Sequence, residues 1–410
     1  MTVSPKLKTS KTKSPKSKGP LILFIVILII VAGIVQVSRP YPAAGVKPIS
    51  QDITLPGQLA VSFPDQGESA VGTENLGVVA STDQQGSVPI ASLTKMMTAY
   101  LVLKEHPLKP GEDGPSLTIN AQDVADYQNG VKNGYSVLPV AQGESLTERQ
   151  LLEGLMLPSG DNIATTLARW VSGTEAAFVT KMNETAKSLN MKDTHYDDPS
   201  GVSTTTVSSA VDQIKIAQAA MNDPVFQEIV AMPQATLPVS GTVYNVNSML
   251  GKHGVVGIKT GSTTPAGGCF VSATPVVVGK EKHFILAAVL GQKTVQSLQS
   301  SLEANVQILD QVRSQFKLYP ITPPAAGFGQ ITSAWNSTSD LKTSQPIQVF
   351  GYPGMKVELS ITNLKTELPI NANENVATLT INTGSQTQTV KLNSAQPIKP
   401  PSILWKLIRY

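Results

Sequence analysis

An apolar stretch at residues 21–37 decides where most of this chain can fold. Only Gln36 interrupts it, and six lysines with no acidic residue among them stand before it. At about 1.5 Å per residue, a helix over this stretch spans roughly 25 Å, near the lower limit for crossing a bilayer. The run is longer than the apolar core of a cleaved signal peptide, which is the alternative. Because basic residues stay on the cytoplasmic side, we predict a basic cytoplasmic tail over 1–19, an uncleaved transmembrane anchor over 20–38 and export of the rest.

The composition of the remainder is that of a folded protein. The chain has 410 residues, of which 41% are hydrophobic, so it is long enough for two or three domains. Apart from the lysine tail it is slightly acidic, which argues against a nucleic-acid partner. Cys269 is the only cysteine, so the exported part folds without an internal disulfide, as a large core allows.

The exported part divides into three regions. Residues 39–57, "RPYPAAGVKPISQDITLPG", are rich in proline and glycine and are predicted to be a linker. Residues 58–318 mix β-like and helical runs. Three β-like runs separated by short turns, followed by a helical run, predict an antiparallel sheet flanked by helices, an α/β (α+β) fold; they are 254–261, 269–278, 283–291 and then 297–316.

The last region, 325–410, contains mainly alternating strands. Prolines at 320, 323 and 324 mark its beginning. Segments such as "KVELSITN" and "VATLTINTG" alternate apolar and polar residues, and we predict a small all-β sandwich. It has no cluster of His, Asp or Glu, so a spacer or docking module is the expected role.

A serine and a lysine share one face at the start of a predicted helix. In "SVPIASLTKMMTAYLVLKEH" (87–106), Ser92 and Lys95 are three residues apart and therefore neighbours. A helix N-terminus favours a developing negative charge. Lysine can act as the base for a serine nucleophile when desolvation or a second cation lowers its pKa. Taken alone, S-x-x-K is too short and common to carry a function.

Two further motifs follow in order. In "LLEGLMLPSGDNIATTLARW" (151–170), Ser159 lies in a loop between two apolar helices, and "VVGIKTGSTTPAGGC" (255–269) ends a strand with Lys259, Thr260 and Gly261. S-x-x-K, a serine motif with Asp and Asn, and K-T-G together are the signature of penicillin-binding proteins and class A β-lactamases. Each motif stands in its expected context of helix start, interhelix loop and strand.

These motifs and the words "PIASLTKMMTAY", "DPSGV" and "GIKTGSTTPAGGCFV" resemble the low-molecular-weight penicillin-binding proteins, the serine-type D-alanyl-D-alanine carboxypeptidases of peptidase family S11. The resemblance covers about 58–316 and implies a β-lactamase/transpeptidase-like sheet flanked by helices. The region from 328 resembles that family's C-terminal domain only by position and strand content. A peptidoglycan stem peptide is the implied substrate, with β-lactam antibiotics as covalent inhibitors. No metal or other cofactor is expected, since the four histidines lie in no metal-binding spacing.

The resemblance also implies residue roles. Ser92 attacks the carbonyl between two D-alanines, Lys95 accepts its proton and Ser159 relays a proton to the leaving amine. The backbone N–H groups of Ser92 and Ser262 hold the oxyanion. The predicted substrate-binding residues are Lys259, Thr260, Gly261, Ser262, Asp161 and Asn162.

One position departs from the family pattern. The third residue of the family's S-x-N motif is an amide, whereas Asp161 stands there and Asn162 follows. An ionised carboxylate can only accept hydrogen bonds, whereas an amide can also donate. Either Asn162 takes the amide's place, or Asp161 pairs with a lysine and the enzyme works differently.

Other functions share these motifs. A β-lactamase needs a positioned glutamate for fast deacylation, and "MKDTHYDDPSGVS" offers only aspartates. A DD-endopeptidase or transpeptidase would use the same groups. A non-enzymatic wall protein with the same fold would not need the intact Ser92, Lys95 and Lys259.

Overall fold

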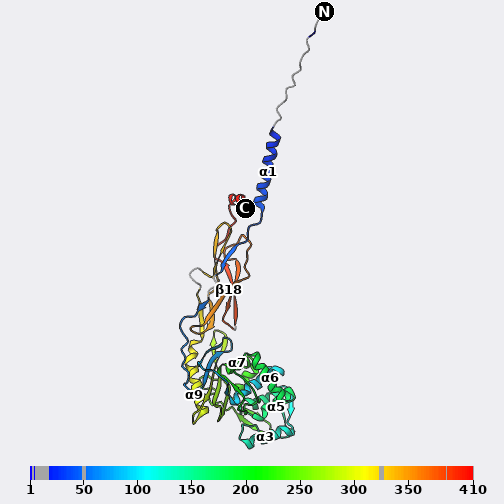
Figure 1. The fold of residues 1–410 in the computed structure, drawn as a ribbon, viewed down its shortest axis with the longest axis vertical. Helices are drawn as coiled ribbons and strands as arrows, with labels where there is room; N and C mark the ends of the chain where they lie inside the picture. The colour runs from blue at the N-terminus through cyan, green and yellow to red at the C-terminus, as the bar shows by residue number, and fades with distance from the viewer. Residues whose placement is uncertain (2–3, 5–17, 49–51, 323–326, 385, 410) are drawn as a thin grey trace.

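The computed structural model describes residues 1, 4, 18–48, 52–322, 327–384 and 386–409, so most of the predicted lysine tail lies outside the described residues. Figure 1 shows three parts along one long axis: helix α1 (Gly19–Ser38), a β-rich part around β18 (Lys356–Thr362), and a mixed part that holds the remaining labelled helices.

The mixed part is built on a five-stranded antiparallel sheet in the order β11-β12-β13-β3-β4. Its strands are β3 (Glu68–Thr73), β4 (Gly77–Ser81), β11 (Gly257–Thr263), β12 (Gly267–Val278) and β13 (Glu281–Gln292). Side chains alternate along the strands. Leu286 and Ala288 pack into one core, and Ile285 and Ala287 into another. The sheet is therefore buried on both faces, and the predicted antiparallel sheet flanked by helices is confirmed.

Different helices cover the two faces. Helix α9 (Ser297–Val312) packs on one face, and α7 (Ala210–Met221) on the other, as Figure 1 shows. Of the other helices, α2 (Lys95–Glu105) and α8 (Pro224–Val230) pack on α7. The rest pack on α2 or on one another; they are α3 (Ala121–Asn133), α4 (Glu148–Met156), α5 (Asp161–Ser172) and α6 (Glu175–Ser188). Short strand pairs join their ends: β5 (Val88–Pro89) with β8 (Val207–Ser208), β6 (Ser116–Thr118) with β7 (Ser145–Thr147), and β9 (Gln234–Leu237) with β10 (Gly241–Tyr244).

The C-terminal part is all β apart from one short helix. A seven-stranded sheet runs in the order β1-β15-β16-β20-β19-β18-β2, and β14 pairs with β17. The strands not yet given are β14 (Lys317–Ile321), β15 (Gly329–Thr332), β16 (Thr338–Lys342), β17 (Ile347–Gly351), β19 (Asn375–Asn382) and β20 (Thr387–Ser394). Tyr319 and Ile321 of β14 already belong to its core, so this part begins earlier than the predicted boundary at 325.

The predicted linker is instead part of this sheet. Within 39–57, β1 (Gly45–Pro48) pairs with β15 and β2 (Ile53–Thr54) pairs with β18, so the segment occupies both edges. Ala44 and Leu55 are buried in the core beside these strands. Open edges expose unpaired backbone groups, and apolar side chains gain by burial. Both effects order the segment despite its prolines.

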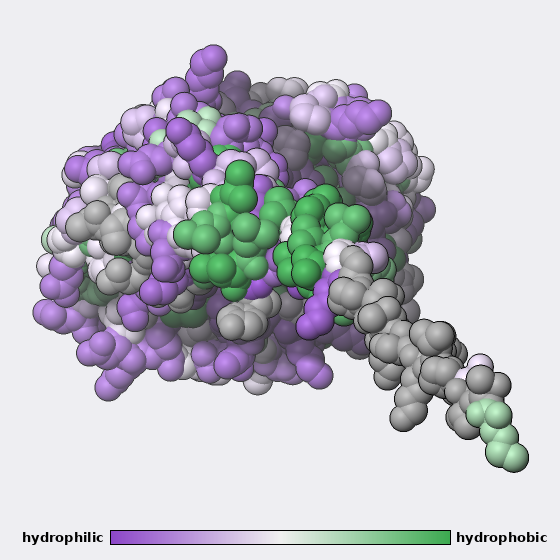
Figure 2. Space-filling view, turned by 90° about the horizontal axis from the view of Figure 1, so that it is seen from above, coloured by the Kyte–Doolittle hydropathy of each residue, from purple (hydrophilic) through white to green (hydrophobic). Residues whose placement is uncertain are grey.

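Helix α1 meets the C-terminal helix α10 (Ile403–Ile408). The Arg409 guanidinium donates to the carbonyl oxygens of Gln36 at 3.1 Å and Arg39 at 2.6 Å, and so satisfies free carbonyls at the end of α1. Figure 2, seen from the α1 end, shows apolar groups gathered on this face. Helix α10 packs against α1 and exposes four apolar side chains; they are Ile403, Leu404, Leu407 and Ile408.

Candidate active site

Ser92 lies in a short 3-10 helix, η1 (Ala91–Thr94), that leads directly into α2. The turn brings Lys95 back to the serine, and the Lys95 Nζ donates to the Ser92 Oγ at 2.9 Å. Ser92 is half-buried, whereas Lys95 is fully buried among apolar residues of α2. The structure therefore places a buried amine within hydrogen-bond reach of an accessible hydroxyl.

Lys95 has two further acceptors. Its Nζ lies 2.5 Å from the Asp161 Oδ1 and donates to the Ser200 carbonyl oxygen at 2.8 Å. A lysine ammonium has three donors and no acceptor. The three acceptors around Lys95 match that number.

The loop after α4 brings Asp161 to this lysine. Ser159 is buried with a positive φ of 68°, and Asp161 is the first residue of α5. A Cβ on Gly160 would lie 2.8 Å from the Gly154 carbonyl oxygen, so the tight approach of the loop to α4 depends on glycine. The Asn162 amide accepts from the Leu138 N–H at 2.9 Å and donates to the Leu138 carbonyl at 3.0 Å. Of the two alternatives for this loop, the structure has Asp161 paired with a lysine, and Asn162 does not take the amide's place.

Strand β11 carries the third motif against the serine turn. A Cβ on Gly261 would lie only 3.0 Å from the Ser92 backbone nitrogen, so the absence of a side chain permits this contact. Lys259 and Thr260 are buried, whereas Ser262 is exposed. Burial, helped by the nearby Lys95 cation and opposed by Asp161, lowers the pKa of Lys259 to about 7. Lys259 therefore lies close enough to Lys95 and Asp161 to feel both charges.

Residues 198–201 also border Lys95. No role was predicted for them, although "DPSGV" is one of the words that resemble the family. The Asp198 carboxylate accepts from the backbone N–H groups of Ser200 at 2.7 Å and Gly201 at 2.6 Å. Burial raises the pKa of Asp198, but the hydrogen bonds from Ser200 and its neighbours outweigh it and the pKa is lowered. This turn fixes the Ser200 carbonyl that Lys95 contacts. An Asp followed by Pro, Ser and Gly was the available signal.

A cavity of about 390 Å³ opens beside Asp161. Five carboxylates line it, together with polar and apolar groups: Asp126, Asp161, Glu175, Asp197 and Asp198. Burial raises the pKa of Glu175, and Asp198 adds to the shift. Arg169, from α5, pairs with Asp126 at 2.7 Å. The lining of this neighbouring cavity is therefore acidic.

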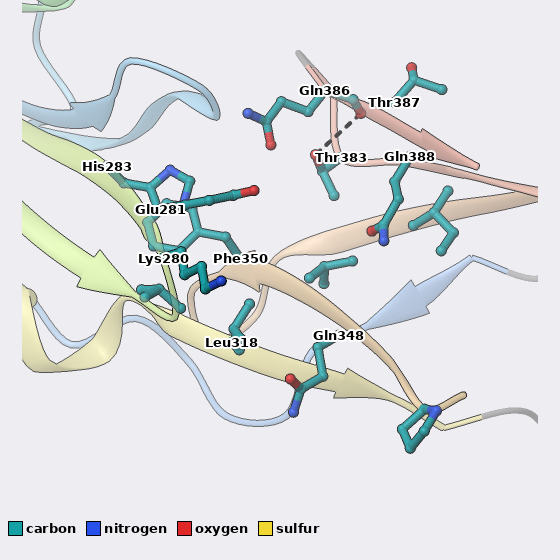
Figure 3. Close-up of a pocket in the computed structure, with 14 residues that line it drawn as sticks. Lys280, Glu281, His283, Leu318, Gln348, Phe350, Thr383, Gln386, Thr387 and Gln388 are labelled. Carbon is teal, nitrogen blue, oxygen red and sulfur yellow. Dashed lines mark hydrogen bonds and ion pairs between the residues drawn. The ribbon is translucent and has the colours of Figure 1, made fainter. Parts of the chain in front are cut away.

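A larger cleft, of about 760 Å³, lies between the mixed part and the C-terminal part (Figure 3). Lys280, Glu281 and His283 reach it from the β12–β13 hairpin, and Gln386 and Gln388 face them from the β19–β20 hairpin. The cleft belongs to the junction of the two parts and is separate from the serine site.

Comparison with known proteins agrees with the motifs. The family model for D-alanyl-D-alanine carboxypeptidase, peptidase S11, matches residues 69–294, more than half of the chain. D-alanyl-D-alanine carboxypeptidase DacB2 of Mycobacterium tuberculosis is 36% identical over 203 residues, which are 48% of this chain. The chain spans 65% of that relative, just under two thirds of its length.

Solved structures agree with the fold. The crystal structure of the Streptomyces K15 DD-transpeptidase matches with a TM-score of 0.52 and 27% identity, over 64% of this chain and 100% of that chain. A structure titled peptidoglycan synthesis regulatory factor (PBP3), from Streptococcus pneumoniae, matches with a TM-score of 0.60 and 20% identity over 82% of this chain and 100% of its own, which supports the fold alone. From the family match over the sheet and all three motifs, the chain belongs to the D-alanyl-D-alanine carboxypeptidase family, peptidase S11.

Proposed function

We propose that this protein is a membrane-anchored serine D-alanyl-D-alanine carboxypeptidase that trims peptidoglycan stem peptides through an acyl-enzyme on Ser92. The observation that carries the proposal is the 2.9 Å hydrogen bond between the buried Lys95 Nζ and the Ser92 Oγ. Family membership supports the reaction class.

In the acylation step, the Ser92 oxygen attacks the carbonyl carbon of the terminal peptide bond while Lys95 takes the hydroxyl proton. Charge on the carbonyl oxygen is stabilised by the backbone N–H groups of Ser92 and Ser262, an arrangement worth about 3 kcal/mol per donor. The C–N bond then breaks, and D-alanine leaves after its nitrogen receives a proton through Ser159. Water attacks the ester in the second half-reaction and regenerates Ser92.

The substrate carboxylate is bound by Lys259 and Thr260. Both are buried within β11, next to the serine turn. A charged ammonium in a dry site binds an anion through a strong, charge-assisted hydrogen bond. This contact requires a free C-terminal carboxylate on the substrate.

Helix α1 is the proposed anchor. It is long and apolar enough to cross a membrane, and its side chains are exposed. The preceding lysines favour a cytoplasmic N-terminus, which leaves the catalytic part on the extracytoplasmic side. The apolar face of α10 lies beside the end of α1, where it supports contact with the same membrane surface.

Release of D-alanine tests the proposal. The detergent-solubilised full chain is incubated with a pentapeptide ending in D-alanyl-D-alanine and, separately, with a cross-linked dimer. We expect D-alanine from the pentapeptide, none from Ser92→Ala, and little cleavage of the dimer. Preferential cleavage of the dimer would instead identify an endopeptidase, and rapid turnover of a chromogenic cephalosporin a β-lactamase.

Transpeptidation is the second candidate, because a matching solved structure is named a DD-transpeptidase. Both reactions form the same acyl-enzyme and differ in whether water or an amine takes the acyl group. Adding an amino-acid acceptor to the pentapeptide reaction separates them. We expect the shortened acid to remain the main product, whereas a peptide joined to the acceptor would identify a transpeptidase.

A further inference from the structure

The ion pair between Lys95 and Asp161 raises a question of proton balance. Lys95 donates to Ser92, Asp161 and Ser200 at once, which uses all three ammonium hydrogens. An ammonium has no lone pair, so it cannot accept the Ser92 proton. One proton must therefore leave Lys95 before the serine can be activated.

Asp161 is the group placed to receive that proton. Its Oδ1 lies 2.5 Å from the Lys95 Nζ, and both side chains are almost wholly shielded from solvent. The other acceptors around Lys95 are a hydroxyl and a backbone carbonyl, neither of which takes up a proton near neutral pH. In a dry site, an ion pair has lost its hydration, so transfer to an uncharged acid and amine becomes accessible.

Charged groups from several elements surround the pair. Lys259 faces it from β11, and burial together with the Lys95 cation lowers the pKa of Lys259 to about 7. Asp198 lies behind the Ser200 carbonyl, where its carboxylate is held by hydrogen bonds. Asp126, Glu175 and Asp197 face Asp161 across the cavity. The 2.5 Å contact singles out Asp161 among these carboxylates.

We propose that Asp161 is the internal proton acceptor of Lys95, so that acylation needs no proton exchange with solvent. This inference rests on the proposed function. The proton moves from the Lys95 Nζ to the Asp161 Oδ1, leaving a neutral amine and a neutral carboxylic acid. Ser92 then forms the C–O bond to the substrate carbonyl, and its proton passes to Lys95. When the C–N bond breaks, the electron pair goes to the leaving nitrogen, which receives that proton, and Asp161 returns its own to Lys95.

This role accounts for the departure from the family's amide. An asparagine at 161 has no group that takes up a proton near neutral pH, so Lys95 would have to lose its proton to solvent. Asp161 thus acts through Lys95 as a positioning residue rather than as a substrate ligand. A transfer within the pair exchanges no proton with solvent, so the acylation rate should depend little on pH.

The test is the pH profile of Ser92 acylation by a labelled penicillin. Rate constants are extrapolated to saturating penicillin, where binding by Lys259 no longer contributes, and the detergent-solubilised full chain is used. We expect the wild-type constant to change by less than about threefold between pH 6 and 8, and that of Asp161→Asn to fall about tenfold from pH 7 to pH 6, as for one ionisation. Asp161→Glu, which retains a carboxylate, should keep the flat profile at a reduced rate.

Asp197→Asn is the matched control. It removes a carboxylate that lines the same cavity but bonds to Ser203 rather than to Lys95. It should reproduce the wild-type profile. The same acid-side loss in Asp197→Asn, or profiles of one shape in the wild type and Asp161→Asn, would overturn the proposal. If thermal melting shows that Asp161→Asn does not fold, the wild-type profile decides alone. A tenfold fall in its acylation rate constant from pH 7 to pH 6 then rejects the role of Asp161. Absence of any wild-type adduct would reject the proposed function instead.

Discussion

Two buried lysines share the site but differ in their partners. Lys95 faces a carboxylate at 2.5 Å, whereas the Lys259 Nζ donates to the Thr260 carbonyl at 3.1 Å. Burial without a carboxylate in contact is what lowers the pKa of Lys259 to about 7. The charge of Lys259, which is proposed to bind the substrate carboxylate, therefore changes with pH near neutrality.

This sensitivity predicts how substrate binding depends on pH. Below pH 7 Lys259 is mostly charged, and above pH 7 it is mostly neutral, so KM for a D-alanyl-D-alanine peptide should rise about fivefold from pH 7 to pH 8. Lys259→Gln should raise KM at pH 6 and make it nearly constant with pH. Steady-state kinetics at several pH values measure both effects, and a wild-type KM that does not change over this range would contradict the assignment.

Sequence spacing predicted some residue contacts and missed others. Ser92 and Lys95 are three apart, and helical geometry alone brings them together. The choice between Asp161 and Asn162 was open, because it depends on how α5 starts after Gly160 and on whether Leu138 offers its backbone to the amide. The Ser200 contact is made by a backbone carbonyl, which every residue has, so no side-chain pattern announces it.

Four chain segments pack together to form the site: η1, β11, the loop at 159–161 and the turn at 198–201. A Cβ on Gly201 would lie 1.9 Å from the Ala91 carbonyl oxygen and 2.6 Å from the Thr94 Oγ1. Gly201 also has a φ of +87°. The turn can therefore approach the serine only because this position lacks a side chain.

Gly201→Ala should displace the serine turn. We expect penicillin acylation of Ser92 to fall at least tenfold and stability to fall by roughly 2–4 kcal/mol, from backbone strain and overpacking together. Gly134→Ala is the control, since Gly134 has a φ of +71° at the end of α3 but open space around it. It should lose only about 1 kcal/mol and acylate normally. Penicillin labelling measures acylation, and chemical denaturation measures stability. Equal acylation by both variants would argue against this packing.

Strand prediction succeeded where the elements are long and failed where they are short. The meander of β11, β12 and β13 was predicted because its runs are apolar and separated by turns. β1 and β2 have four and two residues, too few for a period-two pattern to emerge among prolines. Their partners come from β15 and β18, far along the chain, so local sequence could not indicate the pairing.

At the level of the whole molecule, the chain passes through the C-terminal part twice. The segment after α1 covers both edges of its sheet before entering the mixed part, and the chain returns to α1 through α10 (Figure 1). The link between helix α1 and the mixed part is therefore a folded β structure. Its integrity depends on the few apolar residues that the N-terminal segment contributes.

Leu55→Ala tests this dependence. Leu55 is 1% exposed in the C-terminal core, and we expect the C-terminal part to lose about 2–5 kcal/mol of stability. Trp335, packed against this core, reports its unfolding by fluorescence, while penicillin labelling should persist. The exposed neighbour on β2, Thr54→Ala, is the control. A Leu55→Ala chain as stable as the control would mean that the segment acts as a simple linker.

The junction between the two parts contains a carboxyl that titrates near neutrality. Burial raises the pKa of Glu74 from 4.5 to about 7, and its neighbour His283 stacks on Phe350 of β17 at 3.9 Å. A raised folded pKa means that the folded state retains a proton the unfolded state has lost. The resulting stabilisation is complete below pH 4.5 and is lost as pH rises to about 7.

Glu74→Gln should therefore remove a pH-dependent contribution of up to roughly 3 kcal/mol to the free energy of unfolding. Denaturant unfolding between pH 5 and 8 measures it, and the variant's stability should decline less with pH than that of the wild type. Glu281→Gln removes an exposed carboxylate 3.6 Å from His283 and should leave the change of unfolding free energy with pH as it is in the wild type. If Glu74→Gln shows the same change with pH as the wild type, the raised pKa of Glu74 is contradicted.

The proposed function depends most directly on Ser92 being the nucleophile that Lys95 activates. Mass spectrometry of the full chain after treatment with benzylpenicillin measures this in one experiment. We predict a single stable adduct that peptide mapping assigns to Ser92, is absent from Ser92→Ala, and forms about 100-fold or more slowly in Lys95→Ala, as expected on loss of a general base. An adduct on another residue, or undiminished labelling of Ser92→Ala, would contradict it.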